Sequence, residues 1–250
     1  MNTYQFGRIF LINSLLILTV NGLFYWQPFK ALLAQRPVAI SLGLALYVIQ
    51  TLVTYRLAGR QKGWLIQPFQ GRRLLQGFGA ILLIEVMTIA LISIFTTHSQ
   101  GNALPSRLPD YLLVFIFNSL PGALLEEWLF RYLPLRFAQQ SNQRFKSILL
   151  CLRVLIFFTL CHVPAYLLQH ERSLTELGQV FVMGGCFLGV YLMTRNLFFT
   201  ALFHGLTNNP LYLIESPYYW LYFYTTIAVV SVFWAFLNHR NQHKTLPVNP

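Results

Sequence analysis

Long apolar runs constrain this chain more than any other feature of its sequence. A run of about 20 apolar residues is long enough to cross the hydrocarbon core of a bilayer as a helix. Only 10% of the 250 residues are charged and 56% are hydrophobic, whereas a soluble domain has about 25% charged residues. We therefore predict an all-α, polytopic membrane protein whose residues 1–250 form a single integral membrane domain. The expected spans, about eight in number, are near 7–26, 37–58, 75–97, 111–135, 150–169, 176–194, 197–214 and 218–238.

The basic residues predict how these spans are oriented. The net charge of +11 comes mostly from short segments between apolar runs, which indicates contact with membrane lipids and no binding of nucleic acid. Twelve basic residues fall on the side of the two termini: Arg8, Arg56, Arg60, Lys62, Arg72, Arg73, Arg136, Arg144, Lys146, Arg195, Arg240 and Lys244. Four fall on the other side: Lys30, Arg36, Arg107 and Arg172. Because cytoplasmic loops are enriched in lysine and arginine, we expect both termini in the cytoplasm and a location in the plasma (inner) membrane.

The fourth apolar run contains three charged residues that would be costly in lipid. Glu126, Glu127 and Arg131 occur in the stretch LLEEWLFRY, and a charge at the centre of a span costs about 2.5–3.5 kcal/mol on insertion scales. Glu127 and Arg131 are at positions i and i+4, on one helix face. Glu126 is rotated by about 100° from Glu127. We expect Arg131 to neutralise Glu127, which leaves Glu126 free for chemistry.

Two later runs contain further polar side chains at helical spacing. The fifth contains FTLCH, which ends at His162, and the seventh contains HGLTN, which begins at His204 and ends at Asn208. Because lipid cannot satisfy such groups, we expect them to meet Glu126 in one polar pocket inside the membrane. A single buried histidine is usually a satisfied core residue, but this set comes from three different spans.

These three stretches resemble the motifs of a known family. EEWLFR fits the pattern E-E-x-x-x-R, FTLCH fits F-x-x-x-H and HGLTN fits H-x-x-x-N. Their order and spacing are similar to those of the CPBP family, the CAAX protease and bacteriocin-processing intramembrane proteases, also called the Abi family. The resemblance covers about 118–209, which would form the catalytic core. This chain has Tyr132 where a glycine often follows the arginine of the first motif, which bears on pocket width and substrate choice.

The resemblance implies about eight helical spans around a cytoplasm-facing cavity, and hydrolysis of a peptide bond in a hydrophobic or prenylated, CAAX-type substrate. By the same resemblance, Glu126 would activate water with help from His162, and His204 and Asn208 would stabilise the oxyanion. Glu127 and Arg131 would organise the site. Whether a metal takes part stays open: Glu126, His162 and His204 are a donor set that a divalent ion such as zinc accepts, and metal-free chemistry is the alternative.

Two other classes of function stay open at this point. A non-enzymatic membrane partner of the same family, such as an immunity or maturation factor, would retain the polar cluster as a structural network. The presence of every motif residue counts against that alternative. A transporter would also place acids inside the membrane, but the sequence shows no inverted repeat of the kind common in transporters.

Overall fold

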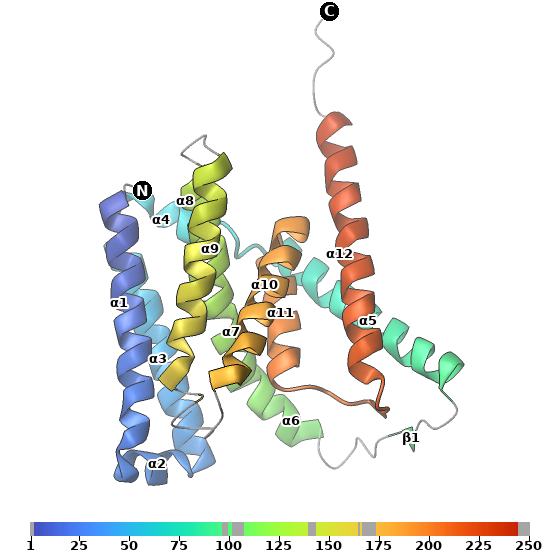
Figure 1. Ribbon diagram of the computed structural model, residues 1–250, viewed down its shortest axis with the longest axis horizontal. Coiled ribbons are helices and arrows are strands. Elements are labelled where there is room, and N and C mark those ends of the chain that lie inside the picture. The colour runs from blue at the N-terminus through green and yellow to red at the C-terminus, as the bar shows by residue number, and fades with distance from the viewer. Residues whose placement is uncertain are drawn as a thin grey trace, which may run out of the picture.

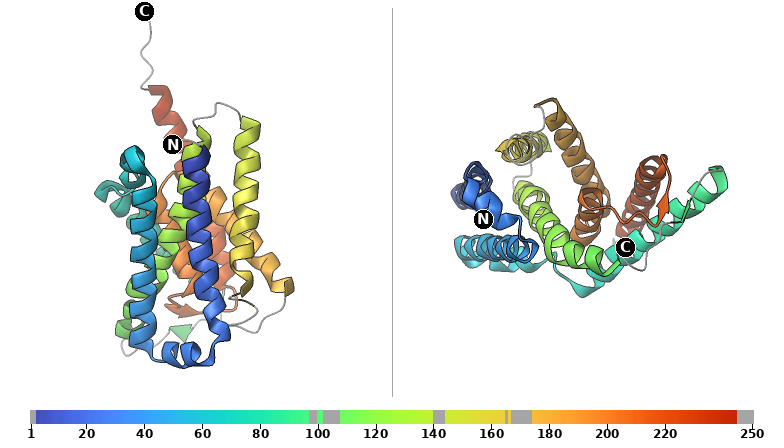
Figure 2. Two further views of the ribbon diagram at one scale, coloured as in Figure 1. Left: turned by 90° about the vertical axis from the view of Figure 1, so that its left-hand side faces the viewer. Right: turned by 90° about the horizontal axis from the view of Figure 1, so that it is seen from below.

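The computed structural model describes residues 3–96, 100–101, 108–139, 144–164, 166 and 174–244. Helices dominate these residues and lie side by side in a bundle (Figure 1 and Figure 2). The first half comprises α1 (Thr3–Gly22), η1 (Leu23–Tyr25), α2 (Gln27–Leu33), α3 (Arg36–Leu57), η2 (Gly59–Gln61), α4 (Lys62–Ile66), α5 (Gly71–Phe95), β1 (Gln100–Gly101), α6 (Leu108–Val114) and η3 (Phe115–Ser119). The second half comprises α7 (Leu120–Glu127), η4 (Trp128–Tyr132), α8 (Leu133–Ala138), α9 (Arg144–Cys161), η7 (Leu174–Glu176), α10 (Leu177–Thr194), α11 (Leu197–Asn208), β2 (Ile214–Glu215) and α12 (Tyr219–Lys244).

The polytopic all-α class is as expected, although the seventh expected span is shorter than the sequence indicated. Six helices of the described chain are long and apolar enough to cross a membrane. α9 spans Arg144–Cys161, and its apolar part begins at Ile148; of the fifth expected span, residues 165 and 167–169 lie outside the described residues. α11 has 12 residues, which is about 18 Å at 1.5 Å per residue and too short for a hydrocarbon core of about 30 Å. α11 is therefore an internal helix, packed against α5 and α7.

The helical segments that correspond to the eight expected spans are called the first to the eighth pass, whether or not each is long enough to cross a membrane. The fourth pass, which runs from α6 through α8, is one helical column with two wide turns. The π-helical segments η3 and η4 each end shortly before a proline, Pro121 and Pro134 respectively. Proline removes a backbone donor and its ring crowds the preceding turn, and a π turn widens the helix at that point. The second wide turn directly follows Glu127 and contains Arg131, so the column widens at the charged residues.

The boundary between the sixth and seventh expected spans lies at Arg195 and Asn196, as the sequence indicated. Arg195 has φ 52°, a left-handed conformation that ends α10. Asn196 then caps α11: its side-chain oxygen accepts a hydrogen bond of 3.1 Å from the backbone N–H of Phe199. At the same beginning of α11, Gly77 lets α5 approach closely, because a Cβ there would lie 2.8 Å from the nitrogen of Phe199.

The two ends of the bundle differ in what they contain. The beginning of α1 and the end of α12 lie at the same end of the bundle in both side views (Figure 1 and Figure 2). The short antiparallel pairing of β1 with β2 joins Gln100 to Glu215 and Gly101 to Ile214, and lies at the opposite end (Figure 1).

Candidate active site

The charged pair of the fourth pass is completely buried. Glu127 is 0% exposed and Arg131 is 2% exposed, and the Nη1 atom of Arg131 lies 3.4 Å from Oε1 of Glu127. This is the i,i+4 ion pair that the spacing indicated. Two buried charges are tolerated only when they are paired and further hydrogen-bonded, so additional partners of this pair are expected nearby.

One such partner is His204, which the sequence did not assign to Glu127. Nδ1 of His204 lies 2.9 Å from Oε1 of Glu127, and the imidazole is 3% exposed. The same carboxylate oxygen therefore bridges Arg131 and His204, which come from the fourth and seventh passes. A carboxylate can only accept hydrogen bonds, so Nδ1 carries the proton and the Nε2 atom of His204 presents its lone pair away from Glu127.

His162 is oriented in the same sense by a different partner. It follows the last residue of α9, and its Nδ1 atom lies 2.8 Å from the backbone oxygen of Phe158. Because a carbonyl oxygen can only accept, Nδ1 of His162 is the donor, and in the neutral form of the ring Nε2 carries the lone pair. Phe158, the first residue of the F-x-x-x-H motif, thus fixes the imidazole through its backbone, and its ring lies 4.4 Å from that imidazole.

Both free nitrogens face Glu126. Its Oε2 atom lies 3.8 Å from Nε2 of His204 and 4.0 Å from Nε2 of His162. Among the described residues, Oε2 of Glu126 is buried and has no direct hydrogen-bond partner. The two distances exceed a direct hydrogen bond, but a water molecule with contacts of about 2.8 Å could bridge the oxygen to either nitrogen.

Aromatic rings and a glycine fix the position of Arg131. The guanidinium carbon lies 4.0 Å from the ring centre of Phe158 and 5.7 Å from that of Phe187. Phe187 also stacks on His204 at 4.2 Å. Nη2 of Arg131 reaches the backbone oxygen of Gly184 at 3.5 Å. Sequence reasoning missed Phe187 and Gly184. The glycine pair of the sixth run is their only local signal, because a small residue is needed where helices approach closely.

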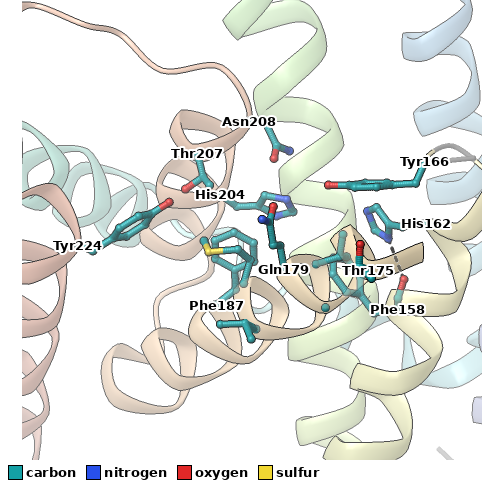
Figure 3. A pocket seen from close by; sticks show the side chains of 14 residues that line it. Phe158, His162, Tyr166, Thr175, Gln179, Phe187, His204, Thr207, Asn208 and Tyr224 are labelled. Carbon is teal, nitrogen blue, oxygen red and sulfur yellow. Dashed lines mark hydrogen bonds between the residues drawn. The ribbon is translucent and has the colours of Figure 1, made fainter. Parts of the chain in front are cut away.

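Two adjoining cavities meet at this cluster. The larger, of about 930 Å³, is lined by His162, His204 and Asn208, and Figure 3 shows the phenol of Tyr166 directed toward His204 across it. The smaller, of about 190 Å³, is lined by Glu126 and again by His162. The four residues predicted to be catalytic thus come together at one junction, with Asn208 exposed on the larger cavity.

The donor types at this junction suit zinc, but their spacing does not. Zinc bonds of about 2.0–2.2 Å in tetrahedral geometry place two ligand atoms about 3.4 Å apart, and the carboxylate oxygen of Glu126 lies 3.8 and 4.0 Å from the two imidazole nitrogens. In the part of the chain that the structure describes, no group of three or more His, Cys, Asp and Glu side chains is arranged to hold a metal ion. We therefore derive no chemical step through a metal.

One comparison with known proteins covers the part of the chain that contains this site. Residues 108–209 match the family model described as "Type II CAAX prenyl endopeptidase Rce1-like". The match spans less than half of the chain and contains all six predicted site residues. It confirms, over this segment, the resemblance to CAAX proteases that the three motifs indicated. Comparisons with curated proteins and with solved structures found no match.

Proposed function

We propose that this protein is an intramembrane endopeptidase in which Glu126 activates water, because the segment that contains the site, residues 108–209, matches the Rce1-like CAAX protease family model. The Rce1-like family is a protease family, and the chain is an integral membrane protein with several apolar helices. The substrate we propose is a polypeptide with a hydrophobic or prenylated segment, because the family's description names prenylated CAAX substrates.

The observation that carries this proposal is the convergence of three lone-pair atoms. Oε2 of Glu126 and the Nε2 atoms of His162 and His204 surround a space that fits one water molecule. The water donates one hydrogen bond to Glu126 and one to an imidazole, so its oxygen lone pair is free to attack a carbonyl carbon. Glu126 then takes the proton that the water loses as the new C–O bond forms.

The remaining groups stabilise the negative charge that develops on the substrate oxygen. The amide N–H of Asn208 is available on the larger cavity to donate to the oxyanion, a type of contact worth about 2.7–4 kcal/mol in other enzymes. The Nδ1 atom of His204 stays bonded to Glu127, 2.9 Å away, which orients the imidazole at the edge of the space where the oxyanion forms. Collapse of the tetrahedral intermediate breaks the C–N bond, and the proton held by Glu126 passes to the leaving amine.

The test compares Glu126→Gln with a matched control, Glu85→Gln. Both are intramembrane glutamates, but Glu85 accepts hydrogen bonds of 3.1 Å from Tyr219 and lies outside the cluster. Purified protein would be assayed on a panel of fluorogenic peptides, prenylated and unprenylated. We expect Glu126→Gln to lose at least about 100-fold in kcat, the lower range for general-base catalysis, and Glu85→Gln to retain cleavage. Full cleavage by Glu126→Gln would refute the role of Glu126, and a wild type that cleaves none of these peptides would favour a non-enzymatic partner.

A further inference from the structure

Contacts between the segments that connect the helices define two ends of the bundle, and this definition does not depend on where a membrane lies. At one end, Nη1 of Arg36 at the beginning of α3 lies 3.5 Å from Oδ1 of Asp110 in α6. The same end contains the pairing of Gln100 with Glu215, which joins the connection after α5 to the connection after α11. The connections that follow the first, third and seventh passes therefore lie together, away from both termini (Figure 1).

The opposite end is defined in the same way. Nδ2 of Asn196, between α10 and α11, donates a hydrogen bond of 2.9 Å to the backbone oxygen of Arg73 at the beginning of α5. The guanidinium carbon of Arg136, in α8, lies 5.3 Å from the ring centre of Trp64 in α4. The connections that follow the second, fourth and sixth passes therefore lie together, at the end where α1 begins and α12 ends (Figure 1 and Figure 2).

The large cavity belongs to the end away from the termini. His162 directly follows α9, which runs from the terminal end to the other end, and Gln179 is at the beginning of α10, which runs back. His204 is four residues, or about 6 Å, from the end of α11, and Asn208 is the last residue of that helix. Gln179 and Asn208 are exposed. The cavity thus reaches the surface where α9 ends, α10 begins and α11 ends.

Two expectations from the sequence are therefore incompatible in this fold. The family resemblance implies a cavity that faces the cytoplasm, and the basic residues imply cytoplasmic termini, but the cavity and the termini lie at opposite ends. The charge asymmetry favours the second expectation. The twelve basic residues assigned to the side of the termini belong to helix ends and connections at the terminal end, whereas Lys30 and Arg36 are at the cavity end. The other two residues of the sequence assignment, Arg107 and Arg172, lie outside the described residues. The excess belongs to short connections and helix ends, where positive charge controls orientation most strongly.

Resting on the proposed function, we propose that the catalytic cavity opens on the extracytoplasmic face of the membrane. The substrate is then a hydrophobic polypeptide segment presented from that face, such as an exported peptide or the outer flank of a membrane-inserted segment. A soluble cytoplasmic protein with a prenylated C-terminus would meet the terminal end of the bundle, on the far side of the membrane from the exposed Asn208 and Gln179.

The test measures orientation and cleavage in the same sealed membranes. Gln27→Cys, in α2 at the cavity end, and Gln67→Cys, between α4 and α5 at the terminal end, are matched exposed positions. Each is introduced into a background that lacks the three native cysteines. Right-side-out and inside-out vesicles are treated with a membrane-impermeant maleimide. Parallel samples of wild-type protein receive an impermeant peptide with a hydrophobic centre and charged ends, with and without detergent.

In right-side-out vesicles we expect Gln27→Cys to be labelled without detergent and Gln67→Cys only after detergent. We also expect these vesicles to cleave the peptide at least tenfold faster than inside-out vesicles. Labelling of Gln67→Cys alone from outside, or cleavage confined to inside-out vesicles, would overturn the orientation and leave the proposed protease intact. If both vesicle types fail to cleave even in detergent, the proposed function fails, and the claim of an outward-facing substrate fails with it.

Discussion

Replacing Glu127 with glutamine should destabilise the protein more than the same change at Glu126. Glu127 is 0% exposed, and its Oε1 atom contacts both Arg131, at 3.4 Å, and His204, at 2.9 Å. Glutamine keeps the size of the side chain but removes its negative charge. Arg131 is then left as a buried cation whose remaining contacts are aromatic rings and the backbone oxygen of Gly184.

The expected magnitude follows from these contacts. Leaving one partner of a buried ion pair uncompensated costs about 3–5 kcal/mol. The amide oxygen of glutamine still accepts one hydrogen bond from Arg131 or His204, which offsets about 1 kcal/mol. The net loss in the free energy of unfolding is about 2–4 kcal/mol, or roughly 5–15 °C in Tm for a chain of this size. The Glu126 side chain is 30% exposed, and its Oε2 atom has no hydrogen-bond partner among the described residues, so Glu126→Gln should shift Tm by less than about 3 °C.

Thermal unfolding of the two purified variants in the same detergent micelles measures this difference, and cleavage of one peptide measures activity in parallel. Glu127→Gln should lose both stability and activity, whereas Glu126→Gln should lose activity alone. Equal Tm values for the two variants, or a lower Tm for Glu126→Gln, would show that the Glu127 carboxylate does not compensate Arg131, and the division of roles between the two glutamates would be wrong.

The remaining predictions concern packing, capping and metal. Gly184→Ala should lower Tm and cleavage, because its Cβ would lie 2.7 Å from Cδ1 of Leu155, and such overpacking costs about 1–3 kcal/mol. Gly185→Ala is the neutral control, because its Cβ would lie 3.9 Å from Cδ2 of Leu155. Equal Tm values for the two variants would contradict the close approach of α9 and α10. Asn196→Ala should destabilise by about 1 kcal/mol through loss of the α11 cap, measured by thermal unfolding, and an unchanged Tm would argue against the cap. Prolonged treatment with a zinc chelator should change kcat by less than about twofold, because the spacing of the site exceeds a tetrahedral zinc edge; loss of activity that zinc restores would refute this.

Local patterns in the sequence determined much of this protein. The length of the apolar runs specified helices, because a backbone in lipid must satisfy its own hydrogen bonds. The i,i+4 spacing of Glu127 and Arg131 specified their ion pair, because that spacing repeats on one helix face wherever the helix lies. The positions of Arg195 and Asn196 marked the break between α10 and α11, because a left-handed residue and a capping side chain act within one turn.

Only the tertiary structure decided how these helices meet. The hydrogen bond from His204 to Glu127 joins residues 77 positions apart, and no periodicity within either helix encodes it. The shortness of α11, which packs against α5 and α7, depends on these neighbours and not on the apolar length of its own run. The placement of the cavity and the termini at opposite ends of the bundle has the same origin. Charge patterns indicate on which side of the membrane each end of a pass lies, but only the packed bundle determines at which end the side chains of separate passes enclose a space.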